Sequence, residues 1–199
     1  MNKILAILLF LFSTNLFAQK SSDNQILNVL LAPSSNIKAD TVINEKGEII
    51  KITKPTINDL VVMRYTSDIS ETLMNFDNLL KDGLSNLDKS TLLDFKNQNT
   101  TTSKIDSLQI SNTVVLFIEN ADAKKIIKKN KWDLFEKKYP NAKLIISISK
   151  IGYSIDNKQA LLFSTNNNYL GGNYGFFTLY KQIDNEWKID QSTMVFLDR

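Results

Sequence analysis

Apolar and polar residues alternate along the last third of the chain, between residues 144 and 197. Four runs rich in β-branched and aromatic residues are separated by polar segments, among them the turns Asp156-Asn157-Lys158 and Asp184-Asn185. A period of two residues interrupted by such turns is typical of antiparallel strands that follow one another in a meander. The strands are predicted at 144–153, 159–164, 174–182 and 186–197.

Within these strands, the alternation predicts which side chains share a face of the sheet. In the third strand, Phe177 and Leu179 belong to one face, and the other face carries Phe176, Thr178 and Tyr180. In the fourth strand, the residues of equal parity that are expected to face the core are Trp187, Ile189, Val195 and Leu197.

Helical spacing precedes the alternating region. Ile69, Leu73, Phe76 and Leu80 recur every three or four residues, which predicts a helix from about residue 68 to Gly83. Shorter helices are predicted at 90–97, 121–129 and 131–138.

A capping residue and a pair of aromatic residues support two of the shorter helices. Asn120 is expected to cap the helix at 121–129, and Trp132 and Phe135 share one face of the helix at 131–138. Strands are predicted at 49–52 and 60–65, and the apolar run 113–118 is predicted to be a buried strand. The sequence therefore predicts a single α+β domain in which short helices pack on a curved C-terminal antiparallel sheet.

The N-terminus has the layout of a secretory signal peptide. Lys3 provides a positive charge, residues 4–12 form an apolar run, and Leu16-Phe17-Ala18 offers a cleavage site after Ala18. The apolar run is shorter than the roughly 20 residues that a membrane-spanning helix needs. We expect a protein exported to the periplasm or the cell exterior, with no stable membrane span after cleavage. Its expected parts are a signal peptide at 1–18, a partly irregular N-terminal segment at 19–45, and the α+β domain at 46–199.

The composition excludes several classes of binding and catalytic site, because the chain contains neither cysteine nor histidine. Disulfides, zinc sites built on these residues, and nucleophilic catalysis that needs a cysteine or a histidine base are excluded. We expect no metal and no cofactor. The formal net charge of +3 falls by one when Lys3 leaves with the signal peptide, so nucleic acid is not an expected partner.

Two short motifs have structural as well as functional interpretations. Ser147-Ile148-Ser149-Lys150 matches the S-x-x-K motif of serine penicillin-binding enzymes, but that motif opens a helix, and here it lies in a predicted strand. Gly171-Gly172 to Gly175 indicates a turn, or a place where an aromatic ring packs close to the backbone, because no lysine and no helix follow as in a phosphate loop.

Charged and aromatic side chains suggest contacts to a partner. A lysine cluster on the two helices after residue 120 indicates either a surface for an anionic partner or the solvated side of those helices. Tyr153, Tyr169 and Tyr174 are candidate ligand contacts, which could stack on a sugar ring or fill the end of a core.

An ordered series of landmarks runs from about residue 114 to residue 189. It consists of Trp132-x-x-Phe135, Tyr139-Pro140-Asn141, Ser149-Lys150-Ile151-Gly152-Tyr153, Ala160-Leu161-Leu162, Leu170-Gly171-Gly172 and Trp187-Lys188-Ile189. The series resembles a group of uncharacterised secreted or periplasmic bacterial proteins with the pattern W-x-x-F…Y-P…S-R-x-G-F-N-x-D…A-L-V-Y…G-x-G…L-x-K…W-x-I. The resemblance implies secretion and an α+β fold with a C-terminal antiparallel sheet, and it brings no established activity. Lys150 stands where that pattern has arginine, and it is the fourth candidate for a ligand or partner contact.

These observations favour an exported protein of the bacterial cell envelope that acts as a non-catalytic binding or structural module. Its partner is expected to be a protein or a glycan of the envelope. One alternative is a small hydrolase that uses carboxylates or a Ser/Lys pair. Another is an immunity-type partner of a second protein. The shape and lining of the concave face of the sheet would separate binding from hydrolysis, since hydrolysis calls for convergent carboxylates in a deep pocket.

Overall fold

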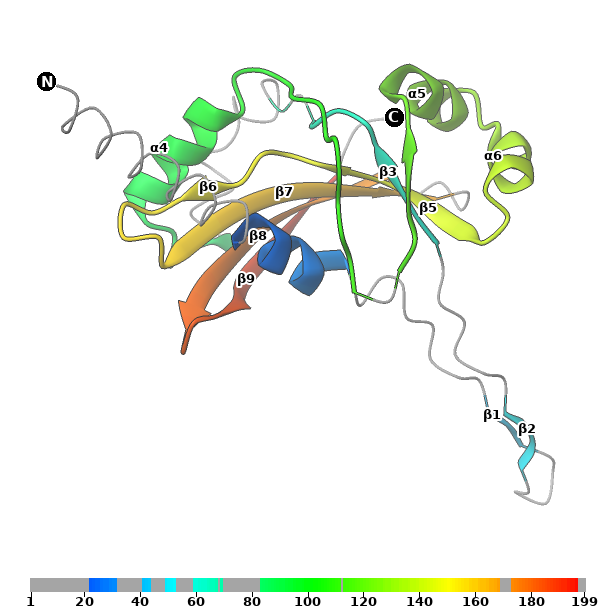
Figure 1. Ribbon diagram of the computed structural model, residues 1–199, viewed down its shortest axis with the longest axis horizontal. Coiled ribbons are helices and arrows are strands. Elements are labelled where there is room, and N and C mark those ends of the chain that lie inside the picture. Colours follow the sequence, from blue (N-terminus) through cyan, green and yellow to red (C-terminus); the bar gives the residue numbers. More distant parts are fainter. Residues whose placement is uncertain are drawn as a thin grey trace, which may run out of the picture.

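A mixed sheet of seven strands is the main feature of the computed structural model (Figure 1). The structure describes residues 22–31, 41–43, 49–52, 59–67, 69, 83–111, 113–168 and 173–196. The predicted signal peptide, the predicted helix at 68–83 apart from Ile69 and Gly83, Tyr169 and Leu197 lie outside the described residues.

The order of strands across the sheet is β4-β3-β5-β7-β8-β9. β3 is parallel to both β4 and β5, whereas the pairs β5–β7, β7–β8 and β8–β9 are antiparallel. β6 pairs with the start of β7, on the edge where β5 pairs with its end. The α+β class and the C-terminal antiparallel meander are thus confirmed, although the first predicted strand is divided into β5 and β6. The strands are β3 (Asp59–Met63), β4 (Val115–Ile118), β5 (Ala142–Ile148), β6 (Gly152–Tyr153), β7 (Gln159–Asn167), β8 (Asn173–Ile183) and β9 (Glu186–Phe196).

The backbone confirms the two predicted turns. Asp184 and Asn185, between β8 and β9, have φ values of 50° and 65°, and Asn157, before β7, has a φ of 55°. Asn and Asp enter this left-handed region more readily than other residues with a side chain. A two-residue turn with positive φ at both positions matches the twist of the flanking strands, so Asp184 and Asn185 fix the register of the β8–β9 hairpin.

β9 contains a bulge that simple alternation does not reveal. Tyr180 pairs with Ile189, but the preceding Leu179 pairs with Gln191, which leaves Asp190 as an extra residue on β9. One extra residue inverts the parity of the side chains beyond it.

The bulge overturns one prediction about the core. Trp187 packs on one face of the sheet and Val195 on the opposite face, each in a different hydrophobic cluster. Ile189 is 52% exposed. The expectation that all three face the same core is therefore wrong, whereas the predicted division of β8 into a Phe177–Leu179 face and a Tyr180 face is confirmed.

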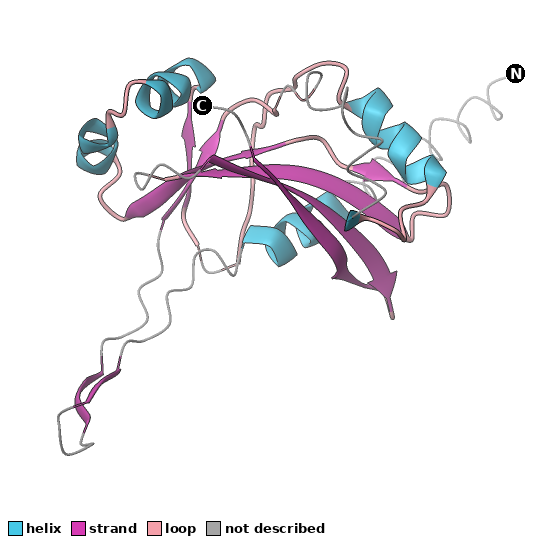
Figure 2. Ribbon diagram, turned by 180° about the vertical axis from the view of Figure 1, so that it is seen from behind, coloured by secondary structure: helices cyan, strands magenta, loops and turns pink. Residues whose placement is uncertain are grey.

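Three short helices cover one face of the sheet, as Figures 1 and 2 show: α4 (Lys89–Gln98), α5 (Asn120–Lys128) and α6 (Trp132–Lys138). Phe95 of α4 is buried edge-on against Phe177, with ring centroids 6.0 Å apart. Trp132 and Phe135 of α6 are both buried, as their spacing predicts. The three predicted short helices are confirmed to within about two residues at each end.

Two predictions about the region around β4 are wrong. The run 113–118 is predicted to be a buried strand, but β4 forms the edge of the sheet, and only Ile118 among its residues is fully buried. Asn120 does not cap α5, because Glu119 occupies the cap position. Instead, the Asn120 side chain accepts a hydrogen bond from the Tyr65 backbone N–H at 3.0 Å and donates one to the Tyr65 carbonyl at 3.2 Å. The amide thus ties the start of α5 to the end of β3.

A separate two-stranded sheet precedes the main sheet in the chain. β1 (Thr41–Ile43) pairs antiparallel with β2 (Ile49–Ile52), which confirms the predicted strand at 49–52. The pair lies apart from the seven-stranded sheet (Figure 1).

Candidate functional site

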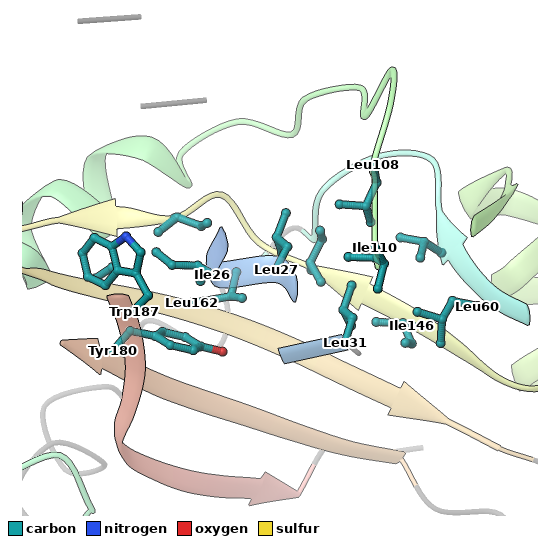
Figure 3. Packing of buried hydrophobic residues seen from close by; sticks show 14 of the residues in the cluster. Ile26, Leu27, Leu31, Leu60, Leu108, Ile110, Ile146, Leu162, Tyr180 and Trp187 are labelled. Atoms are coloured by element: carbon teal, nitrogen blue, oxygen red, sulfur yellow. The ribbon is translucent and has the colours of Figure 1, made fainter. Parts of the chain in front are cut away.

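A helix over residues 22–31 lies against the face of the sheet opposite α4, α5 and α6 (Figure 1). Ile26, Leu27 and Leu31 fall on one side of this helix and are buried. They pack on the side chains that β7, β8 and β9 present to this face, including Leu162, Tyr180 and Trp187 (Figure 3). The curved sheet and the helix together form the largest hydrophobic cluster, and a cavity lies near each end of the helix.

Asn28 anchors the middle of the helix to the segment that precedes β4. Its side-chain amide donates to the Gln109 carbonyl at 3.0 Å, and its side-chain oxygen accepts from the Ser111 N–H at 2.7 Å. The same amide also donates to the Asn24 carbonyl at 2.8 Å. One asparagine thus satisfies backbone groups on two segments that are far apart in the sequence.

Asp23 anchors the start of the helix to the sheet. The Tyr153 hydroxyl donates to its carboxylate at 2.5 Å. Burial raises the pKa of Asp23 above its ordinary value of 3.8, and the bond from Tyr153 offsets part of that effect. Burial also raises the pKa of Tyr153, and the nearby carboxylates of Asp23 and Asp94 add to the rise, so Tyr153 stays a neutral donor.

The cavity near Asp23 is a polar cleft of about 400 Å³, which we call the lysine cleft. Lys150 and Lys104 both line it, together with Asp106. The backbone of Lys150 is fixed by the side chain of Asn99, which accepts from its N–H at 2.9 Å and donates to its carbonyl at 3.0 Å. The remaining lining residues are Asp23, Asn24, Leu27, Thr66, Gln98, Ile105, Ser107, Leu108, Ile148, Ser149 and Ile151.

Both carboxylates of the lysine cleft and the Ser149 hydroxyl already have partners within the protein. Asp23 accepts from Tyr153, and Asp106 forms an ion pair with Lys104 at 3.3 Å. The Ser149 hydroxyl accepts from the Phe163 N–H at 3.0 Å and donates to the Lys150 carbonyl at 2.8 Å. Asp23, Asp106 and Ser149 thus each take part in contacts that hold the protein together, and no hydrogen bond among the described residues joins a serine of the cleft to a lysine ammonium group.

Ser147, the first residue of the S-x-x-K match, also has a structural role. It lies in β5, where its hydroxyl bonds with Thr165 at 2.6 Å and accepts from Ser67 at 2.9 Å. The match therefore forms strand contacts and not the helical geometry of the enzymes.

The second cavity is a groove of about 210 Å³ on the curved face of the sheet, which we call the sheet groove. Its apolar half comes from Leu30, Leu31, Phe176 and Ile189. Its polar half is uncharged and consists of Ser164, Asn166, Thr178 and Ser192. The groove lies near the end of the helix over residues 22–31, where β7, β8 and β9 extend beyond the helix.

The polar groups of the sheet groove are only partly used by the protein itself. Thr178 and Ser192 bond to each other at 3.2 Å across the β8–β9 pair. The Ser164 hydroxyl and the Asn166 amide make no hydrogen bond within the part of the chain that the structure describes. The Tyr180 hydroxyl is buried and makes no hydrogen bond of normal geometry to a described residue, although Thr178 is close enough to moderate the rise that burial causes in the pKa of Tyr180. Figure 3 shows this hydroxyl pointing toward Leu31, at the groove end of the helix.

The four candidate contacts from the sequence occupy different places. Tyr153 is buried beneath the lysine cleft, where it fills the core and holds Asp23. Lys150 lines the same cleft, and its ammonium group donates to the Thr101 hydroxyl at 3.3 Å. Tyr174 is 37% exposed and pairs across the strands with Asn166, which lines the sheet groove. Tyr169 lies outside the described residues.

Sequence reasoning missed the polar residues of the sheet groove and the role of Asp23. The groove residues look like the polar side of an ordinary strand, as Thr178 does between the buried Phe177 and Leu179. A weak signal for the helix over 22–31 was present, because Ile26, Leu27, Leu30 and Leu31 have helical spacing. Most lysines of the predicted cluster are exposed on or beside α5 and α6, on the face of the sheet opposite the groove.

Comparison of the chain with protein-family models, curated proteins and solved structures gives no match. None of the helices among the described residues has the length and apolar character that crossing a bilayer demands. The described residues also hold no group of three or more His, Cys, Asp or Glu side chains placed to bind a metal.

Proposed function

We propose that the protein is an exported module of the bacterial cell envelope that binds an envelope component on the curved face of its sheet. The supporting observation is the sheet groove, whose lining combines apolar and uncharged polar side chains. A mostly apolar concave site with a few unpaired polar groups is the usual form of a small-ligand site. The layout of residues 1–18 supports export.

The wider surface around the groove supports binding as well. Tyr174, Ile189 and Met194 are large apolar or aromatic side chains on β8 and β9, and each is more than a third exposed. They lie on the groove face of the strands, because Tyr174 pairs with Asn166, Ile189 lines the groove, and Met194 pairs with Phe176. An exposed apolar patch with a polar border commonly marks an interaction surface.

A groove-filling variant tests this function. Ser192 lies at an exposed strand position that lines the groove, so Ser192→Trp fills the groove without disturbing the core. Lys188 is exposed on the opposite face of the same strand, beside Lys181, so Lys188→Trp is the matched control. The mature chain from Gln19 and both variants are incubated with envelope extract and with purified peptidoglycan, and bound material is identified by mass spectrometry and sugar analysis.

We expect the wild type and the Lys188→Trp variant to retain the same envelope component, and the Ser192→Trp variant to lose it. The full-length chain expressed in a bacterium should also leave the cytosol with its mass reduced by residues 1–18. Retention of nothing by the wild type, or an intact N-terminus in the cytosol, would contradict the proposed function.

A further inference from the structure

We infer that the sheet groove binds one uncharged sugar ring, an assignment that rests on the proposed function and names its ligand. The groove holds about 210 Å³, roughly seven times the volume that one water molecule occupies in the liquid. Sites for larger organic ligands usually start at about 300 Å³. The space therefore suits a single ring with one side open to solvent.

The charge of the lining determines the charge of the ligand. All eight described residues that line the groove are uncharged. An ionic ligand would lose hydration there without gaining an opposite charge, which is unfavourable. The ligand of this groove is therefore neutral.

The free polar groups of the groove exclude a purely apolar ligand. Ser164 and Asn166 line the groove and have hydrogen-bonding capacity that no described residue uses. An acyl chain would cover these groups and leave them unpaired, at a cost for each one. A ligand that fits must supply several hydrogen-bonding groups of its own.

A neutral sugar ring matches both halves of the groove. Its C–H face can pack on the apolar side formed by Phe176 and Ile189, as sugars do on apolar and aromatic surfaces. Its hydroxyls both donate and accept, and so do the Asn166 amide and the Ser164 hydroxyl. Tyr174, beside Asn166 in the strand register, is placed to contact the next ring of a longer glycan.

Titration with defined sugars tests the assignment. The mature protein is followed by ¹H–¹⁵N NMR while N-acetylglucosamine, its trimer and maltotriose are added as neutral probes. A trimer of galacturonic acid serves as the charged probe, and decanoate as the apolar one. A single sugar should bind with a Kd on the order of 1 mM, as its size allows. The signals that shift should belong to β7, β8 and β9. Comparison of the monosaccharide with the trimer separates recognition of one free ring from recognition of a glycan chain.

Three variants in the groove and one control variant outside it localise the binding. Asn166→Ala and Ser164→Ala each remove one hydrogen-bonding group and should weaken binding about three- to tenfold. Ser192→Trp should abolish binding, and because it changes an exposed strand position it covers the case in which the other variants fail to fold. Lys104→Ala changes only the lysine cleft and should bind like the wild type.

Several outcomes would overturn the assignment: no shift with any neutral sugar at ten times the expected Kd, shifts confined to residues 104–108, or stronger binding of decanoate than of sugar. In that case the retention experiment decides whether the proposed function fails as well. If the wild type retains an envelope component and Ser192→Trp loses it, only the sugar assignment fails and the proposed function stands. If neither sugar nor any envelope component binds, both fail.

Discussion

Two strand glycines permit unusually close contacts to the backbone. A Cβ atom added to Gly152 in β6 would lie 2.4 Å from the Cα of Phe95, which belongs to the backbone of α4. A Cβ atom added to Gly175 in β8 would instead lie 2.8 Å from the ring of Phe163. The prediction that a glycine near residue 175 lets an aromatic ring pack close to the backbone is confirmed. For Gly152, the sequence offers no comparable clue, because its neighbour Phe95 is distant in the chain.

This difference predicts unequal effects of the same substitution. Gly152→Ala should lower the free energy of unfolding by about 1–3 kcal/mol, since a helix backbone must move to admit the new methyl group. Gly175→Ala should lower the free energy of unfolding less, because the new methyl group meets only side-chain atoms of Phe163 and Val195, which can shift, and alanine reduces the freedom of the unfolded chain. Urea denaturation of both variants measures the difference. An equal loss of stability in the two variants would contradict the argument.

At the scale of elements, local signals in the sequence located most helices and strands. Trp132 and Phe135 have helical spacing in the sequence, and both are buried on one face of α6, as that spacing predicts. The bulge at Asp190 was not predictable, because it depends on how β8 and β9 pair and not on either strand alone. The N-terminal helix was also missed, since its ten residues form a stable helix only when packed on the sheet.

The attachment of the N-terminal helix leads to a second prediction. Asn28→Ala removes the hydrogen bonds to Gln109 and Ser111 and should lower the free energy of unfolding by about 1–2 kcal/mol. Gln25 is exposed on the same helix, and Gln25→Ala should change stability by less than about 0.5 kcal/mol. Urea denaturation gives both values. Hydrogen exchange of the helix amides should accelerate only in the Asn28 variant, and equal exchange in the two variants would show that the anchor is unimportant.

At the scale of the whole molecule, the sequence could not reveal how distant segments meet. The alternation in the last third of the chain predicted an antiparallel meander because consecutive strands pair there. The parallel strands β3 and β4 join the same sheet on the far side of β5, and no local pattern states that order. Likewise, the sheet groove and the lysine cleft arise from residues up to about 160 positions apart, such as Leu30 and Ser192. The proposed site therefore depends on the complete fold, including the helix over residues 22–31.

That dependence makes the stability of the whole molecule sensitive to pH through Asp23. Because burial raises its pKa above 3.8, Asp23 holds a proton more tightly in the folded protein than in the unfolded chain. Its contribution to stability is therefore greatest below about pH 3.8. It declines as the pH rises toward the pKa of the folded state and stays constant above that value. Asparagine at this position can still accept the bond from Tyr153, but it carries no charge.

Asp23→Asn should therefore gain stability relative to the wild type as the pH rises from 3 to 7. Carboxyl groups common to both proteins titrate equally and cancel in this difference, so the difference reports on Asp23 itself. Urea denaturation at several pH values measures it, with Asp133→Asn, at an exposed position on α6, as the control for loss of one carboxylate. The opposite result is that the wild type gains stability relative to Asp23→Asn as the pH rises. That result would mean that the N-terminus of the helix stabilises the Asp23 carboxylate, and the assigned effect of burial would be wrong.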